Sequence, residues 1–552
     1  MLKILIVGGY GGFGRRLVAM LSSEPELHMM VAGRSIAKAQ AVCAGTTAAA
    51  LQPTLFDLNG DVGDQLAELR PDIVVDTAGP FQAYGADPYR LARAALERGI
   101  GYLDIADGRD FVCGIDTLND LAAANETFAL SGCSTVPALS DAVLRVLADG
   151  MTETDGVAAG ITPSGQLAMG LSVIQAIASY AGKPVQVRTG GQSKQRHCLT
   201  DGQWHVLGVP GVIPLVPRRF GLIDVPDLEL MPKRLPGLAS VAFGAGLRPA
   251  TAHYAVRLAA WLVRLRLLPS LMPFSRLMQR SARWMAGGEP RGGMFVELSG
   301  RDDNGPAIRE WVLIAEGDDG PNIPLMASAA LILRCARGER PTPGARPCLD
   351  ELDLADFEPL FGRFQISTGI WERRQAKQTL YRDLLGTAYD RLPTSIATTH
   401  DVSDQKTVTG RARVERGTGW LVALLARFVR LPSASDDVEL TVTFRREGDA
   451  EIWERRYGPE LMRSTMSAGR GTWRHLLIER FGIIAFGFAL TSDQTGLKLH
   501  LKRWSLAGIR LPLWLAPKIK AAETEIDGLF QFDVSVSGRL IGQIARYRGW
   551  LA

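Results

Sequence analysis

The residues with the most recognisable chemistry form a glycine-rich run near the start of the chain, Gly8-Gly9-Tyr10-Gly11-Gly12-Phe13-Gly14. Gly9, Gly11 and Gly14 fit the spacing G-x-G-x-x-G, and starting from Gly8 the run also fits G-x-x-G-x-x-G. It follows an apolar stretch, residues 3–7, and precedes an amphipathic one, residues 15–21, which is the context that a dinucleotide-binding loop requires. Such glycines let the backbone turn tightly and approach a pyrophosphate, which the helix N-terminus then faces. We therefore expect six residues to contact a dinucleotide: Gly8, Gly9, Gly11, Gly12, Phe13 and Gly14.

The residues that follow the second apolar run indicate which dinucleotide binds. An NAD site usually presents a carboxylate about 20 residues after the glycines, where it bonds the ribose 2′-hydroxyl. This chain has Gly33-Arg34-Ser35 there, with Lys38 one turn later. A guanidinium fork and a hydroxyl suit a 2′-phosphate, so the sequence favours NADP(H) over NAD(H). Asp57 could flank the adenine, although it could equally be a surface residue.

Proton donors for hydride transfer are expected beside the nicotinamide, where open α/β sheets bind ligands at the carboxyl ends of their strands. The candidates for this catalytic role are Tyr84, Asp104 and Asp107, and each has a structural alternative, such as capping of a turn by Asp104. No H-E-x-x-H, G-x-S-x-G or C-x-x-C motif occurs, and the histidines form no pair at helical spacing, so we expect no bound metal.

The elements that must position these residues follow from hydrophobic periodicity. Apolar runs alternate with helix-period stretches such as 88–98 and 116–125, which predicts a parallel sheet covered on both faces. Residues 1–150 are thus expected to form a Rossmann domain with a doubly wound parallel sheet. Its strands are expected at residues 3–7, 29–32, 73–76, 102–105 and 127–130.

Two further domains are expected after residue 150. Residues 151–365 have mixed α+β character and are assigned to substrate binding or dimerisation. They include strands at 294–299 and 310–315, a helix at 323–337 that returns to the Rossmann domain, and a proline-rich connector at 340–347. Residues 372–552 are expected to form an α+β domain with an antiparallel sheet. Its predicted hairpins pair 438–445 with 451–457, 483–490 with 497–504, and 530–535 with 540–547, and its predicted helix is 419–429.

Further motifs carry a resemblance to a known family. The glycine loop, Gly33-Arg34, the run from Thr77 to Phe81 with Tyr84-Gly85, and Gly101-Tyr102-Leu103-Asp104 together resemble the saccharopine dehydrogenase-like NADP-binding family. The resemblance implies that four residues line the cofactor: Ala78, Gly79, Pro80 and Phe81. Asp107-Gly108-Arg109 departs from the family pattern, and no counterpart of a saccharopine-binding arginine set is evident. The C-terminal part resembles a domain of unknown function that is fused behind such reductases, which argues against saccharopine as the substrate.

Bulk composition limits the class of protein. The net charge of +4 over 552 residues argues against a dedicated nucleic-acid binder. Sparse, unpaired cysteines fit a reducing cytoplasm, and the N-terminal run is too short for a signal peptide.

One apolar stretch, residues 255–285, is unusual because its charges are nearly all arginine. It could contact an anionic membrane peripherally, close a hydrophobic substrate pocket or form a homodimer interface.

The sequence therefore predicts an NADP(H)-dependent oxidoreductase that acts on a small hydrophobic or lipid-like substrate. The alternative is a non-catalytic NADP-binding sensor or scaffold whose C-terminal domain binds a lipid or a protein partner.

Overall fold

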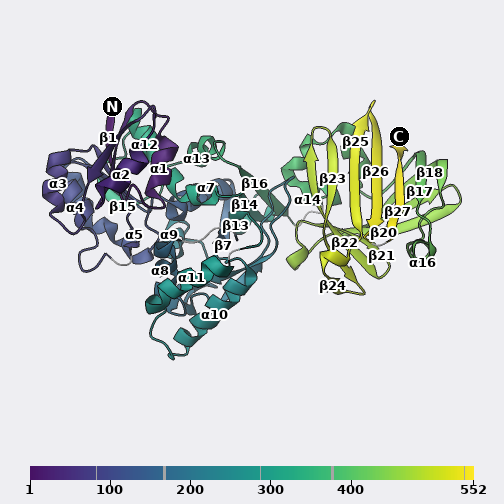
Figure 1. Ribbon diagram of the computed structural model, residues 1–552. Coiled ribbons are helices and arrows are strands. Elements are labelled where there is room, and N and C mark those ends of the chain that lie inside the picture. Colours follow the sequence, from purple (N-terminus) through teal and green to yellow (C-terminus); the bar gives the residue numbers. More distant parts are fainter. Residues whose placement is uncertain (82–83, 166–169, 286, 375–377, 540) are drawn as a thin grey trace. The chain divides into compact units, whose positions relative to one another are not determined.

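The computed structural model describes the chain except for residues 82–83, 166–169, 286, 375–377 and 540 (Figure 1). The described chain forms two compact units. Unit 1 comprises residues 1–203 and 218–367, and unit 2 comprises residues 204–217 and 368–552. Among the described residues, no helix combines the length and the apolar character needed to cross a membrane.

Unit 1 begins with a seven-stranded sheet of order β15-β6-β5-β4-β1-β2-β3, in which neighbouring strands pair in parallel. Without β15, this is the 3-2-1-4-5-6 order of a dinucleotide-binding fold. The strands are β1 (Leu2–Val7), β2 (Leu27–Gly33), β3 (Ala50–Leu55), β4 (Ile73–Asp76), β5 (Gly101–Asp104), β6 (Phe128–Ser131) and β15 (Gly344–Pro347). The predicted doubly wound parallel sheet is confirmed.

Helices cover both faces of this sheet. On one face, Leu5 and Val74 of the strands share a buried cluster with Leu66 and Leu91. On the other face, α1 packs near α12, where Ser328 Oγ donates a hydrogen bond to the Cys133 carbonyl (2.9 Å). The helices are α1 (Gly14–Leu21), α2 (Ile36–Cys43), α3 (Val62–Leu69), α4 (Arg90–Leu96), α5 (Arg109–Cys113), α6 (Asn119–Ala124), α7 (Ser140–Ala148), α12 (Ile323–Ala336) and α13 (Leu354–Phe361).

The proline-rich segment 340–347 is not only a connector, so that prediction was wrong. Its residues 344–347 form β15, which pairs in parallel with β6 from Gly344–Phe128 to Pro347–Ser131. The pairing depends on a partner more than 200 positions away, and Pro347 can occupy the edge strand because no further strand needs its missing N–H.

The second sheet, most of which lies in unit 1, contains parallel and antiparallel pairs in the order β10-β11-β12-β7-β13-β14-β16, and with its helices it gives this region the predicted α+β character. β7 pairs in parallel with β12 and antiparallel with β13. The strands are β7 (Met151–Thr162), β10 (Gly202–His205), β11 (Arg218–Leu222), β12 (Ser240–Ala245), β13 (Gly292–Asp302), β14 (Gly305–Ala315) and β16 (Ile366–Arg374). A separate hairpin joins β8 (Pro184–Thr189) to β9 (Gln192–His197), and the helices are α8 (Leu171–Tyr180), α9 (Asp227–Arg234), α10 (Ala250–Arg264) and α11 (Ser275–Met285).

Unit 2 contains an antiparallel sheet that closes on itself. The order is β22-β21-β20-β19-β18-β17-β27-β26-β25-β23-β24, and the additional pairing of β22 with β23 joins the two ends. We call the ring of β17–β23 and β25–β27 the closed sheet. Its strands are β17 (Gln405–Arg416), β18 (Ser435–Glu447), β19 (Ala450–Tyr457), β20 (Glu460–Ala468), β21 (Leu477–Phe481), β22 (Ile484–Asp493), β23 (Gly496–Leu506), β25 (Lys518–Ile526), β26 (Leu529–Gly538) and β27 (Gly542–Leu551).

The predicted antiparallel character of this region is confirmed, including the three hairpins over the described residues. β18 pairs with β19, β22 with β23, and β26 with β27. The described part of unit 2 also contains the α-helices α14 (Leu380–Leu385), α15 (Thr394–His400) and α16 (Trp420–Val429) and the short β24 (Ile509–Leu511). The closure of the sheet was not predicted.

Candidate dinucleotide site

The glycine loop leaves the carboxyl end of β1 and enters α1, and its geometry leaves too little room for a Cβ at Gly8, Gly9, Gly11 and Gly14. Gly8 has φ +78°, and a Cβ there would lie 2.9 Å from Ala78 Cα. A Cβ on Gly14 would lie 2.3 Å from the Gly8 carbonyl oxygen. At Gly12, in contrast, a Cβ would meet no protein atom within 4 Å, so the loop is open on that side. This combination of a tight turn and an open backbone fits a pyrophosphate.

Tyr10 connects the glycine loop to the end of β2, a role that the sequence analysis missed. Its ring fills the space beside Gly33, where a Cβ would lie 2.4 Å from Tyr10 Cε1. The Tyr10 hydroxyl accepts a hydrogen bond from the Ser35 N–H (3.2 Å), and Lys38 Nζ lies 5.9 Å from the ring centroid. In the sequence, the sign of this role was an aromatic residue, Tyr10, inside the glycine motif. Tyr10 therefore holds the residues predicted to select the cofactor next to the loop.

The end of β2 carries positive charge without a nearby carboxylate in the sequence. Arg34 and Lys38 are exposed and Ser35 is half-buried. Within the described chain, no ion pair engages Arg34. Asp57, after β3, accepts a hydrogen bond from the Asn59 N–H (3.0 Å) and so caps a turn; its contact with the adenine stays a prediction.

The loop after β4 lies against the glycine loop. Thr77 Oγ1 donates a hydrogen bond to the Val7 carbonyl (2.8 Å), and Ala78 is the residue that a Cβ on Gly8 would strike. The Phe81 ring is buried against Phe111, with the centroids 5.1 Å apart. The segment containing Gly79 and Pro80 thus extends from the carboxyl end of the sheet beside the expected cofactor position, and residues 82–83 lie outside the described chain.

Tyr84 hydrogen-bonds a buried carboxylate that the sequence analysis did not select. Its hydroxyl donates to Asp76, with distances of 3.0 and 2.9 Å to the two carboxylate oxygens. Burial raises the pKa of Asp76 to about 6, although hydrogen bonds from the Ala78 N–H, Tyr84 and Tyr102 oppose the shift. Burial, followed by the charge of Asp76, raises the pKa of Tyr84. In the sequence, the sign of this role was that Asp76 is the last residue of an apolar strand.

Asp104 occupies the matching position on β5, opposite Asp76 in the strand register. It is fully buried and accepts hydrogen bonds from the N–H groups of Ala106 (2.9 Å) and Gly132 (2.8 Å). Burial raises its pKa to about 7, and these N–H groups oppose the shift. The hydrogen bond from Gly132 joins the end of β5 to the end of β6. Asp104 therefore has a structural role, which was the alternative to catalysis given for it from the sequence. Asp107, the third predicted donor, is exposed and interacts with other groups of the chain.

Comparisons with known proteins agree with the resemblance noted from the motifs. Residues 4–149 match the family model described as the saccharopine dehydrogenase NADP binding domain. Residues 392–551 match the model of a domain of unknown function, DUF4166. The predicted fusion is therefore confirmed, and the N-terminal region is a nucleotide-binding domain of dehydrogenase type. No curated protein matches the chain.

Solved structures overlap with the chain only weakly. An engineered D-amino acid dehydrogenase is 15% identical with a TM-score of 0.33, covering 65% of this chain and 98% of its own. The WlbA (WbpB) dehydrogenase from Thermus thermophilus, in complex with NAD and alpha-ketoglutarate, is 13% identical with a TM-score of 0.30, covering 62% and 90%. A probable dehydrogenase from Thermotoga maritima is 7% identical with a TM-score of 0.31, covering 64% and 92%.

Proposed function

We propose that the protein is an NADP(H)-dependent oxidoreductase that acts on a hydrophobic, lipid-like substrate. The observation that carries the proposal is the glycine loop, where Gly8 and Gly14 exclude side chains and Gly12 leaves the backbone open. It lies in a domain that matches an NADP-binding family model. The exposed Arg34 and Lys38, and the absence of a carboxylate directly after β2 in the sequence, support the phosphorylated form of the cofactor.

The residues around the sheet's carboxyl end suggest a division of roles. When bound, NADPH supplies a hydride. The N-terminus of α1 and the loop backbone bind its pyrophosphate, while Phe81 and its neighbours cover one side of the site. Of the three predicted donors, we assign the proton to Tyr84, which is half-buried; its single O–H, which donates to Asp76 in this structure, would turn to the substrate to deliver the proton.

A deuterium-transfer experiment tests the function and does not require an identified substrate. The protein is incubated with each stereoisomer of 4-deuterated NADPH and a cellular lipid extract, and products are examined by mass spectrometry. We expect one stereoisomer to label an apolar product, and the Gly11→Asp variant to give no label. NADPH binding without transfer to any component would favour the sensor or scaffold alternative.

Cofactor selectivity is tested by Arg34→Ala. We expect NADPH affinity to fall roughly ten- to a hundredfold, or about 1.5–3 kcal/mol, because a charge-assisted contact to the 2′-phosphate is lost. NADH affinity is expected to change less than about twofold, since NADH lacks that phosphate. Calorimetric titration with both cofactors measures the difference, and Arg90→Ala, which removes another exposed arginine, is the control. Equal losses for both cofactors would contradict the role of Arg34.

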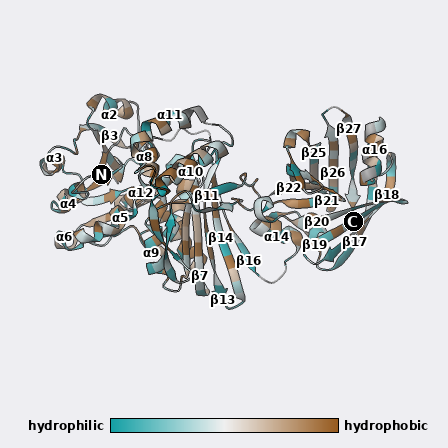
Figure 2. Cartoon of the chain, turned by 90° about the horizontal axis from the view of Figure 1, so that it is seen from below, coloured by the Kyte–Doolittle hydropathy of each residue, from teal (hydrophilic) through white to brown (hydrophobic). Residues whose placement is uncertain are grey.

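The surface of α10 and α11 supports an apolar substrate or a lipid surface as a partner. Figure 2 shows hydrophobic residues along α10. Several large apolar side chains of this region are exposed: Leu258, Leu262, Leu265, Leu267, Phe274 and Leu277. Arg264 pairs with Asp201 (3.3 Å) and lies over the Trp261 ring, so its charge is partly compensated. Arg266, Arg276 and Arg280 are exposed without ion pairs in the described chain.

We therefore expect unit 1 to bind anionic membranes through this surface. Changing Arg266, Arg276 and Arg280 to Gln should lower binding by between about tenfold and a hundredfold, because three basic residues at about 1 kcal/mol each contribute about 3 kcal/mol, of which salt screens part. Flotation with phosphatidylcholine vesicles, with and without phosphatidylglycerol, measures the effect. The control changes three exposed arginines elsewhere in unit 1 to Gln, namely Arg90, Arg196 and Arg340. Equal loss in both variants, or no vesicle binding at all, would contradict the assignment.

A further inference from the structure

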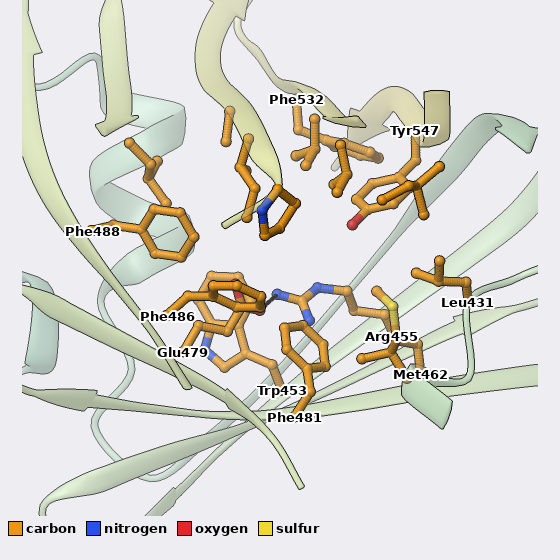
Figure 3. Close-up of a pocket in the computed structure, with 18 of the residues that line it drawn as sticks. Leu431, Trp453, Arg455, Met462, Glu479, Phe481, Phe486, Phe488, Phe532 and Tyr547 are labelled. Atoms are coloured by element: carbon orange, nitrogen blue, oxygen red, sulfur yellow. Dashed lines mark hydrogen bonds and ion pairs between the residues drawn. The ribbon is translucent and has the colours of Figure 1, made fainter. Parts of the chain in front are cut away.

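The closed sheet of unit 2 surrounds a large cavity. Its volume is about 920 Å³, which is near the upper end of the range found for small-molecule sites in proteins. Ten strands closed on themselves leave an interior wider than their own side chains fill. Figure 3 shows side chains from opposite walls pointing into this space. The cavity is therefore large enough for a ligand.

The wall of the cavity is almost entirely apolar, because alternate residues of each strand point inward. β18 contributes Leu440, Val442 and Phe444. β22 contributes Ile484, Phe486 and Phe488, and β26 contributes Phe530, Phe532, Val534 and Val536. A ligand of matching size would bury most of its surface against aliphatic and aromatic groups.

The charged groups inside the cavity are paired with one another, whereas Arg539, which also lines it, is exposed and has no ion pair among the described residues. Arg455 Nη2 lies 3.2 Å from Glu479 Oε1, and its guanidinium lies over the Trp453 ring. His400 Nε2 lies 2.7 Å from Glu523 Oε2. An anionic ligand could pair with Arg455 only by displacing Glu479. Breaking this buried ion pair would be unfavourable. The inner part of the lining, away from the exposed Arg539, therefore favours an uncharged ligand.

Two tyrosine hydroxyls can position one polar group of such a ligand. Tyr381 is fully buried and lines the cavity, and its hydroxyl has no hydrogen-bond partner among the described residues. The Tyr547 hydroxyl points into the cavity in Figure 3. Burial raises the pKa of both phenols, so they are neutral hydrogen-bond donors. A carbonyl or hydroxyl oxygen on the ligand can accept a hydrogen bond from the Tyr547 hydroxyl, and it reaches the unpaired Tyr381 hydroxyl only if neighbouring side chains move, because that oxygen is fully buried.

Part of the rim of the cavity is also apolar. Trp514 and Leu515, in the short helical turn Leu513–Leu515, line the cavity although their side chains are 65% and 48% exposed. Large exposed apolar side chains at the entrance to an apolar site are typical of a surface that contacts an apolar molecule.

We propose that this cavity binds one uncharged lipid with a long acyl or alkyl chain and a carbonyl or hydroxyl oxygen. The chain packs against the strands, and the oxygen accepts a hydrogen bond from Tyr381 or Tyr547. This site lies wholly within unit 2 and does not depend on the oxidoreductase proposal.

Binding is tested on the full chain with a fluorescent probe, the methyl ester of pyrenedodecanoic acid, and with the corresponding free acid. We expect one ester to bind per chain, and the acid to bind at least tenfold more weakly because it is charged. Tighter binding of the acid would overturn the assignment to an uncharged ligand, and no binding of the ester would overturn the site.

Two pairs of variants locate the probe. Val534→Trp should fill the cavity and reduce ester binding at least tenfold, whereas Ser535→Trp, on the opposite face of β26, should leave it unchanged. Equal effects of the two would contradict the site.

Tyr381→Phe and Tyr547→Phe keep the shape of the ring and remove only the hydroxyl. At least one of them should weaken binding of the ester about three- to tenfold and leave binding of a pyrene-labelled alkane unchanged. If neither hydroxyl matters for the ester, the polar contact proposed here is wrong. None of these measurements uses NADPH, so their failure is distinguishable from failure of the proposed function.

Discussion

Gly11→Asp is expected to abolish nucleotide binding, with a loss of NADPH affinity of more than a hundredfold. A Cβ at this position would lie 2.9 Å from the Gly8 carbonyl oxygen, so the loop must shift to admit a side chain. The added carboxylate would also face the pyrophosphate and repel it. A hundredfold loss corresponds to about 2.8 kcal/mol, because each tenfold change is about 1.4 kcal/mol.

Titration calorimetry with NADPH measures this loss, and thermal melting shows whether the variant is folded. Gly237→Asp adds the same charge to unit 1 at an exposed turn, where a Cβ would make only ordinary contacts of 3.4 Å and more. We expect this control to bind NADPH like the unmodified protein. A folded Gly11→Asp variant with unchanged NADPH affinity would show that the site lies elsewhere.

Tyr84→Phe is expected to slow deuterium transfer from labelled NADPH about a hundredfold, the usual scale for removal of a general acid. The substitution keeps the ring contacts with Phe81 and Phe111 and removes only the hydroxyl that donates to Asp76. NADPH affinity should therefore stay within about twofold of the unmodified protein.

Tyr89→Phe is the matched control, because Tyr89 packs against the same Phe111 ring and its hydroxyl donates to the Phe111 carbonyl (2.7 Å). We expect this variant to transfer deuterium at the unmodified rate. If Tyr84→Phe lowered the melting temperature and NADPH affinity along with the rate, Tyr84 would be a positioning residue for Asp76 rather than the donor.

Much of the nucleotide-binding sheet could be predicted because its signals are local. The run Leu2–Val7 is apolar except for Lys3 and rich in β-branched residues. The glycines directly after it are required because a Cβ there would clash with the backbone. The antiparallel hairpins of the C-terminal region were also predictable, since short turns such as Gly448-Asp449 separate strands that alternate in character.

Features that depend on distant partners could not be predicted in the same way. The pairing of β15 with β6 and of β17 with β27 joins segments that lie far apart in the sequence, and no local pattern specifies either. Tyr10 and Asp76 likewise acquire their roles only when the ends of β1, β2 and β4 meet. The cavity was missed because it exists only once the sheet closes.

The central claim is that the N-terminal domain holds NADP(H), and native mass spectrometry tests it most directly. The purified full chain is mixed with equimolar NADPH and NADH, and the masses of the resulting complexes are compared. We predict one added NADPH per chain and little added NADH, because Arg34, Ser35 and Lys38 follow β2 in place of a carboxylate. Addition of NADH in equal or greater amount would contradict the selectivity, and addition of neither nucleotide would contradict the site itself.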